Sequence, residues 1–196
     1  MTDPILLRPL QADDVTECYV GWLNDPGLYR YLGIRHRERP FTAEDIRSFI
    51  EACREVRRFH WGIFLEGRHV GNVSCSEWSH ANHWIDISYI LGEKDVWGRG
   101  VAAAAVGAAI EHLFAAHPFN RIQAHAVMEN IASVRVMEKL GMKRDALLRQ
   151  TAYLPDEKRF TDETIYSILR SEWPKGRECG WDRIRVTPMS WEEPHA

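Results

Sequence analysis

Short apolar runs and amphipathic stripes alternate along the first half of the chain. A run at 5–7 precedes apolar residues at helical spacing within 13–24, with Asp13 and Asp14 in the first turn of that stripe. A second stripe follows Thr42, which has the features of a helix N-cap. These patterns predict a strand and then two helices. Three further runs, separated by short turn segments such as 66–69, predict an antiparallel meander of strands at 61–65, 70–74 and 84–91.

The second half of the chain predicts a crossover followed by a final pair of strands. An alanine-rich helix is expected over 101–116, and the strand that follows it at 122–127 suggests a parallel connection. Asn130 then caps a shorter helix that ends at Gly141. Two more strands are predicted at 145–153 and 164–170, with a polar loop over 154–162 between them. The order β-α-α-β-β-β-α-β-α-β-β indicates a mixed α/β fold.

Prolines and glycines interrupt the pattern after residue 172. We therefore expect one domain over 1–172 and a C-terminal appendage over 173–196, partly ordered by Trp181 and Trp191. A length of 196 residues suits a single domain.

Composition narrows the class of protein. Hydrophobic residues make up 45% and charged residues 27%, as in globular domains. A net charge of -3 gives no basic footprint for nucleic acid. The longest apolar run is far shorter than the about 20 residues that span a membrane, and the start lacks signal-peptide features. The four cysteines are scattered, which predicts reduced thiols. We expect a cytoplasmic protein that binds neither membrane nor nucleic acid.

A glycine-rich loop directly before the long helix carries the clearest chemical signal. Residues 98–103 fit G-x-G-x-x-A, where small residues let a ligand approach the backbone. Free N–H groups and the positive end of the helix dipole then form an anion site. A dinucleotide site is disfavoured, because a polar loop follows Leu91 and the preceding strands look antiparallel. A glycine turn without any ligand is the structural alternative.

The order of elements and this loop resemble the GNAT superfamily of acyl-CoA-dependent N-acyltransferases. The family signature, [Q/R]-x-x-G-x-[G/A], is matched at Gly100 and Ala102 but not at Trp97. The branch of ribosomal-protein alanine N-acetyltransferases often has W-G-[KR]-G-x-A there, and 130–142 and 162–173 also resemble that branch. The resemblance covers about 5–173. It implies a mostly antiparallel sheet of about six to seven strands with one splayed parallel pair, flanked by about four helices.

The resemblance also implies acetyl-CoA as co-substrate. Its pyrophosphate would lie on the backbone N–H groups of the loop, and its pantetheine arm between the strands 84–91 and 122–127. The implied CoA contacts are Ile90, Leu91, Trp97, Gly98, Arg99, Gly100, Val101, Ala102, Asn130, Ser133 and Arg135. Several of these have ordinary structural explanations as well: Arg99 could simply be solvated, Asn130 is a good helix cap, and Arg135 could belong to a charged helix face.

Three residues are candidates for proton transfer. In the branch, the position of Ser133 is assigned to protonation of the CoA thiolate, although a helix serine needs no such role. Asp86 stands where relatives often carry glutamate and is the first candidate for general base, with Glu77 as the second. Solvated acids, or deprotonation through ordered water, are the alternatives. His80 and His83 have no third ligand at convincing spacing, so no metal is predicted.

The expected acceptor is a primary amine that attacks acetyl-CoA directly in a ternary complex. The walls of the acceptor site, by resemblance, carry aromatic and arginine side chains: Trp22, Tyr31, Arg35, Trp78 and Trp84. These favour a small acidic acceptor such as an amino-sugar nucleotide. A protein N-terminus, a polyamine and an antibiotic stay open. So do a homodimer formed through exposed sheet edges and, for the whole chain, a non-catalytic CoA-binding regulatory module.

Overall fold

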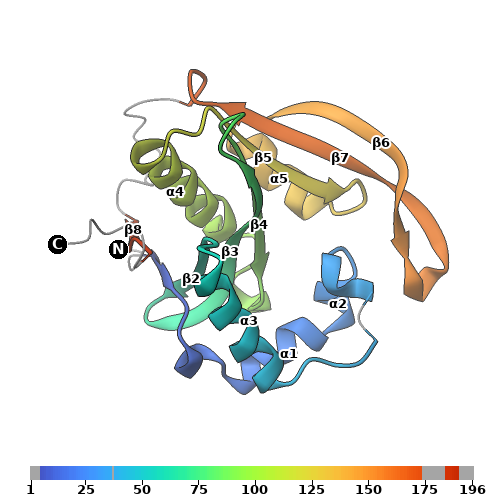
Figure 1. Cartoon of the computed structure of the whole chain (residues 1–196). Helices are drawn as coiled ribbons and strands as arrows, with labels where there is room; N and C mark the ends of the chain where they lie inside the picture. Colours follow the sequence, from blue (N-terminus) through green and yellow to red (C-terminus); the bar gives the residue numbers. More distant parts are fainter. Residues whose placement is uncertain (1–4, 37, 174–183, 190–196) are drawn as a thin grey trace.

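The computed structural model describes residues 5–36, 38–173 and 184–189, and it places all strands in one sheet (Figure 1). The strand order is β6-β7-β5-β4-β3-β2-β1-β8. The strands are β1 Ile5–Pro9, β2 His60–Leu65, β3 Arg68–Ser79, β4 Trp84–Leu91, β5 Arg121–Val127, β6 Lys143–Leu154, β7 Arg159–Leu169 and β8 Arg185–Val186. The helices are α1 Glu17–Asn24, α2 Pro26–Tyr29, α3 Ala43–Glu55, α4 Val101–Ala116 and α5 Ile131–Lys139. The predicted mixed α/β fold is confirmed.

Neighbouring strands β4 and β5 are parallel and separate along their length. Their Cα register joins Trp84–Asp86 to Arg121–Gln123 and extends no further, while β4 continues to Leu91. Beyond these rows β5 stays paired with β7 on its other side. The splayed parallel pair that the sequence implied is therefore present, and the opening lies toward the carboxyl ends of β4 and β5.

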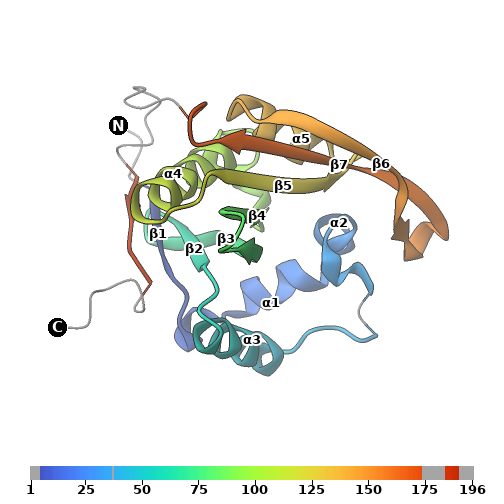
Figure 2. The same ribbon diagram turned by 45° about the horizontal axis from the view of Figure 1, so that its top comes forward.

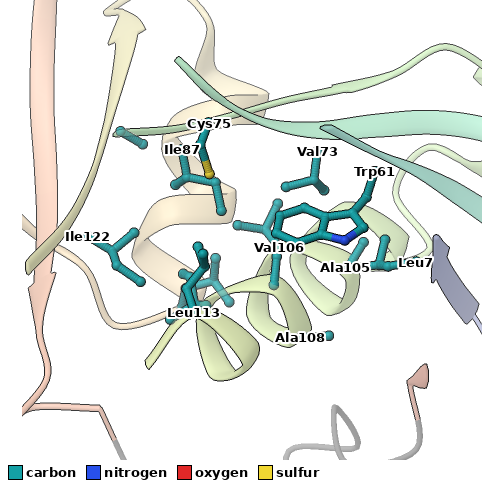
Figure 3. Close-up of a cluster of buried hydrophobic side chains, with 14 of the residues drawn as sticks. Leu7, Trp61, Val73, Cys75, Ile87, Ala105, Val106, Ala108, Leu113 and Ile122 are labelled. Atoms are coloured by element: carbon teal, nitrogen blue, oxygen red, sulfur yellow. The ribbon is translucent and has the colours of Figure 1, made fainter. Parts of the chain in front are cut away.

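Helices cover both faces of the sheet (Figure 2). The main core lies between α4 and the strands, where Trp61, Ile87 and Ile122 are almost fully buried (Figure 3). Ala105 and Ala108 of α4 lie in this core, and their small side chains let the helix backbone approach the sheet. A second cluster packs α1 and α3 against the opposite face, through residues such as Tyr19 and Ile46.

Two segments differ from the sequence prediction. Asp13 and Asp14 lie in a separate 3-10 turn, η1 (Ala12–Asp14), because Asp14 pairs with Arg8 at 2.6 Å, and α1 begins only after its N-cap Thr16. The predicted loop over 154–162 is shorter than expected: the 3-10 turn η4 (Pro155–Glu157) and Lys158 connect the strands, while Leu154 and residues 159–162 belong to the β6–β7 hairpin, in which Tyr153 pairs with Phe160. Apart from the buried Thr161, its polar side chains are exposed or half-buried, so no hydrophobic alternation marks it.

The C-terminal segment contributes to the sheet. Strand β8 pairs in parallel with β1, and Met189 is 5% exposed against the main core. This eighth strand was not expected from the sequence. Trp181 and Trp191, which the sequence suggested would order the appendage, lie outside the described residues.

Candidate active site

The glycine loop leads from the end of β4 into α4. Gly98 and Gly100 have φ of +72° and +82°, a left-handed backbone that glycine adopts without strain. Gly100 is the N-cap of α4, and no side chain caps this end. The helical ladder begins with Ala104 N–H donating to Gly100 O at 3.0 Å, so the N–H groups of the preceding turn project from the helix end. The loop thus has the geometry of an anion site, with the positive end of the α4 dipole behind it.

Cationic and aromatic side chains surround this loop. Lys139, in the last turn of α5, places its Nζ 3.5 Å from the point where a Gly100 Cβ would lie. Arg99 is exposed in the loop itself. The indole of Trp97 donates from Nε1 to Leu91 O at 2.9 Å and so ties the loop to the end of β4. Lys139 was missed by the sequence reasoning, which treated it as part of a charged helix face.

Side chains of β4 and α5 meet on the α4 side of the sheet. Asn130 caps α5 as predicted, with Oδ1 accepting from Ser133 N–H at 3.3 Å. The Tyr89 hydroxyl donates to Ser133 O at 3.0 Å and lies 2.9 Å from Ser133 Oγ. Burial raises the pKa of Tyr89 to about 12, so the phenol is protonated at neutral pH. Tyr89 was not singled out from the sequence, and only its place on the face opposite Asp86 hinted at it.

A carboxylate–imidazole pair lies on the other face of the sheet, where β4 and β5 begin to part. Asp86 Oδ2 is 3.2 Å from His125 Nε2, and Asp86 Oδ1 accepts from Ser76 Oγ at 3.0 Å. Burial raises the pKa of Asp86, and the charge of His125 opposes that rise. The His125 side chain is 40% exposed, which leaves it open to a second molecule. His125 was missed by the sequence reasoning, which weighed only His80 and His83.

The remaining β3 and β4 candidates divide between the two faces. Glu77 lies in a bulge between Cys75 and Trp78, is exposed, and adds to the raised pKa of Asp86 through its negative charge. Trp84 is half-buried two residues before Asp86 and so shares its face. Trp78 instead packs against the main core on the α4 side. Asp86, Glu77 and Trp84 are brought together, whereas Trp78 is directed away from them.

Trp22 and Tyr31, two of the residues expected to wall the acceptor site, have other partners. Trp22 is 6% exposed, and its Nε1 donates to Glu93 Oε1 at 2.9 Å. Its ring lies so close to Gly92 that a Cβ there would be 1.9 Å from it. Trp22 is therefore a core residue, because its helical spacing places it on the buried stripe of α1. Tyr31 is half-buried beside the Arg30 guanidinium, and Arg35 lies in the 3-10 turn η2 (Gly33–His36), its side chain outside the description.

Arg30 and Arg39, which lie before α3, form ion pairs within the protein. Arg30 pairs with Glu157 at 2.5 Å and with Glu129 at 3.6 Å. Arg159 contacts both carboxylate oxygens of Glu129 at 2.6 Å and thereby lowers its pKa to about 2. Arg39 pairs with Asp45. The network of Arg30 joins α2 to the β6–β7 hairpin, so these arginines are not free to bind an anionic acceptor (Figure 2).

Three further observations concern only the residues that the structure describes. Among them, no three His, Cys, Asp or Glu side chains form a group that could hold a metal ion. His80 accepts a hydrogen bond from Trp78 Nε1 at 3.0 Å. No helix in these parts of the chain has both the length and the apolar character needed to cross a membrane.

A splayed parallel strand pair beside a left-handed glycine loop at a helix N-terminus defines a class of acyl-CoA-dependent acyltransferases. The family model described as "Acetyltransferase (GNAT) domain" matches residues 5–143 of this sequence. The chain belongs to the GNAT family of acetyltransferases and is an acyl-CoA-dependent N-acyltransferase. The family resemblance inferred from the sequence is confirmed.

Relatives and solved structures agree with this assignment. "Uncharacterized N-acetyltransferase p20" of Bacillus licheniformis is 26% identical, with 88% of this chain and 96% of the relative covered. A crystal structure of a GNAT-family acetyltransferase from Bacillus anthracis superposes with a TM-score of 0.73 at 26% identity, covering 88% of this chain and 98% of that one. The fold is also similar to that of RimL, a ribosomal L7/L12 α-N-protein acetyltransferase solved with coenzyme A (TM-score 0.73, 17% identity, 83% and 92% covered).

Proposed function

We propose that this chain transfers the acetyl group of acetyl-CoA to a primary amine by direct attack in a ternary complex. The observation that carries the proposal is that two features lie at the same end of β4. One is the left-handed Gly98–Gly100 turn at the start of α4, and the other is the gap that opens between β4 and β5. The first suits a pyrophosphate and the second an extended pantetheine arm. The RimL structure, whose fold is similar, contains coenzyme A.

The loop and its neighbours supply the CoA contacts in this proposal. N–H groups of Val101 and Ala102 bind the pyrophosphate, and the positive charges of Arg99, Arg135 and Lys139 offset its negative charge. The backbone of Ile90 and Leu91, free of β5 beyond the paired rows, aligns with the arm and directs an N–H toward the thioester oxygen. The Oδ1 atom of Asn130 is used in capping α5, so its amide N–H₂ is the group that contacts the arm.

Proton transfers are divided between the two faces of β4. The amine nitrogen attacks the thioester carbon, its proton passes to the Asp86–His125 pair, and the C–S bond breaks. On the α4 face, Ser133 gives its hydroxyl proton to the departing thiolate. The Tyr89 hydroxyl turns from Ser133 O to Ser133 Oγ, 2.9 Å away, returns a proton to it, and is itself reprotonated from solvent. A raised pKa of Asp86 brings its proton affinity closer to that of an amine than an ordinary carboxylate's would be.

The acceptor in this proposal is a primary amine that approaches the face carrying Asp86, Glu77 and His125. Acidic side chains there favour a cationic amine. Arg35 is the one arginine predicted to wall the acceptor site, and its neighbours in sequence Arg30 and Arg39 pair with carboxylates. The argument for an amino-sugar nucleotide therefore depends on Arg35. A panel of amino-sugar nucleotides, polyamines and N-terminal peptides distinguishes a small acidic acceptor from a cationic amine or a protein N-terminus.

Thermal unfolding with acetyl-CoA is the first test of the proposal. At 100 times its Kd, a ligand specific for the folded state adds about 2.7 kcal/mol. For a chain of this size that raises Tm by about 5–10 °C. NAD at the same concentration is the control and should leave Tm unchanged. Equal shifts with both ligands, or no shift with acetyl-CoA, would contradict the cofactor assignment.

Ser133→Ala and Tyr89→Phe test the proton relay on the α4 face. Each should lower kcat by about tenfold or more, because water replaces a positioned acid only in part. The Kd for acetyl-CoA should stay within about twofold, since neither hydroxyl is needed to hold the pyrophosphate. The matched control is Tyr166→Phe, which removes a phenol bonded to Glu138 of α5 at 3.3 Å, and its kcat should stay at the wild-type value. If Ser133→Ala kept the wild-type kcat, Ser133 would be an ordinary helix serine that takes no part in proton transfer.

A further inference from the structure

A second cavity, of about 270 Å³, lies apart from the proposed acetyl-CoA site. It is lined by the end of β1, the last turn of α3, the start of β2 and residues 187–189. The elements β1, α3 and β2 lie near one another in Figure 2. Its polar lining consists mainly of Arg8, Gln11, Arg54, Arg58, His60 and Thr187. None of its lining residues is acidic, and none belongs to the glycine loop or to the Asp86–His125 pair.

His60 lies in this lining without a polar partner. It is 7% exposed, and neither Nδ1 nor Nε2 has a hydrogen-bond partner among the residues that the structure describes. The rings of His60 and Phe49 make an edge-to-face contact, with 5.3 Å between their centroids. This contact uses no polar atom of His60. An imidazole always carries at least one N–H, and a buried N–H without an acceptor is destabilising. His60 therefore presents an unused donor to the cavity.

The turn after α3 brings a second unused donor to the same cavity. Arg57 adopts a left-handed conformation (φ +52°), and Arg58 N–H donates to Cys53 O at 2.7 Å. This geometry closes the helix and reverses the chain direction. Arg58 Nε is buried and has no partner among the described residues.

Among the described residues, the charges around the cavity do not cancel. Arg8 is balanced by Asp14, which it contacts at 2.6 and 2.8 Å. Arg54 makes only a long contact of 3.4 Å to Leu10 O, and no described carboxylate pairs with Arg54 or Arg58. The C-terminal end of α3 by itself favours cations, so the arginines alone would not require a ligand. His60 lies on β2 rather than α3, and its unpaired ring is an independent reason to expect one.

We propose that this cavity binds a small oxyanion, a phosphate or a carboxylate group, through the guanidinium groups of Arg54 and Arg58 and a ring N–H of His60. Planar guanidinium groups bind both kinds of oxyanion through paired N–H donors. The volume admits a free phosphate or a small organic acid, and it is smaller than typical cavities for drug-sized molecules. The bound anion would join α3, β2 and the C-terminal segment.

The test follows the imidazole NMR signals of His60 in the full chain. CoA is present at saturation, so that it occupies the glycine loop and added phosphate cannot bind there. His60→Gln identifies the signals among those of the nine histidines. Phosphate and acetate are titrated separately at constant ionic strength, with chloride as the balancing salt. We expect a saturable shift of the His60 signals. We also expect the pKa of His60, which burial lowers to about 4 in the empty cavity, to rise when the anion is bound.

Variants at two arginines of α3 and its turn separate a built site from general charge attraction. Arg58→Gln should weaken anion binding by about tenfold or more, because it removes a charged donor from a buried site. Arg47→Gln is the matched control, since Arg47 is exposed on α3 beside Glu44, and it should leave binding within about twofold. Thermal unfolding verifies that both variants fold.

Each outcome bears on the proposal. Saturation by phosphate alone identifies a phosphate ligand, and saturation by acetate alone identifies a carboxylate. A His60 signal that follows neither anion, or that responds equally in wild type and Arg58→Gln, would overturn the site and leave a hydrated cavity. Because the His60 signal is local, these results are independent of whether acetyl transfer is confirmed.

Discussion

Gly100→Glu is expected to raise the Kd for acetyl-CoA by at least about 100-fold, or ~2.7 kcal/mol. Gly100 has φ +82° and is the N-cap of α4, so a glutamate there brings a carboxylate to the point where the pyrophosphate should lie. Like charges repel, and the side chain also occupies the space in front of the free N–H groups. Isothermal titration calorimetry with acetyl-CoA measures the effect without knowledge of the acceptor.

The matched control for this substitution is Gly67→Glu. Gly67 has φ +76° in the β2–β3 turn and open space around it, so the variant introduces the same charge and similar backbone strain outside the loop. Its Kd for acetyl-CoA should stay close to the wild-type value. If Gly100→Glu also retained that value while folding normally, the glycine loop would not be the pyrophosphate site.

The second large effect is expected on catalysis rather than on binding. Asp86→Asn and His125→Gln should each lower kcat by about 100-fold or more, the usual contribution of a positioned general base. The two side chains form one unit at 3.2 Å, so the double variant should lose little more than either single variant. The Kd for acetyl-CoA should change by less than about twofold, because the pair lies on the face opposite Tyr89 and Ser133.

The pH profile provides an independent readout of this pair. A base works in its deprotonated form, and burial raises the pKa of Asp86. Activity should therefore fall as pH decreases, beginning at a higher pH than for an ordinary aspartate, with apparent values that belong to the pair. Asp86→Asn should remove or displace that acidic limb. Ser88→Ala, on the same face but exposed, should leave both rate and profile unchanged.

Glu77→Gln resolves the remaining choice of base. Glu77 is exposed in the β3 bulge and influences Asp86 only through its charge. A modest change in the pH profile with little loss of kcat is therefore expected. A large loss in Glu77→Gln together with wild-type activity in Asp86→Asn would move the role of general base to Glu77. Wild-type kcat in both would favour deprotonation through ordered water.

Structural features that depend only on residues close together in the sequence could be predicted from it. A positive φ needs glycine at that position, and a cap bonds to a residue in the following turn, so the glycine loop and the caps at Thr42 and Asn130 could be identified by composition and spacing. Strand alternation by itself also places Asp86 and Tyr89 on opposite faces of β4. The family motifs added the splayed strands, which local pattern alone does not show.

Contacts between residues that are far apart in the sequence are determined only by the tertiary structure. Tyr89 meets Ser133 because β4 and α5 pack on one face, and Asp86 meets His125 because the parallel register brings β5 beside β4. Trp22 could equally have lined a cleft or filled a core until its contact with Gly92 was known. The sequence by itself therefore determined the fold family, through its family motifs, and the backbone of the proposed cofactor site, through local conformational preferences. The pairing of acids, bases and unsatisfied donors, including His60 in its cavity, depends on long-range register and packing, which no local pattern encodes.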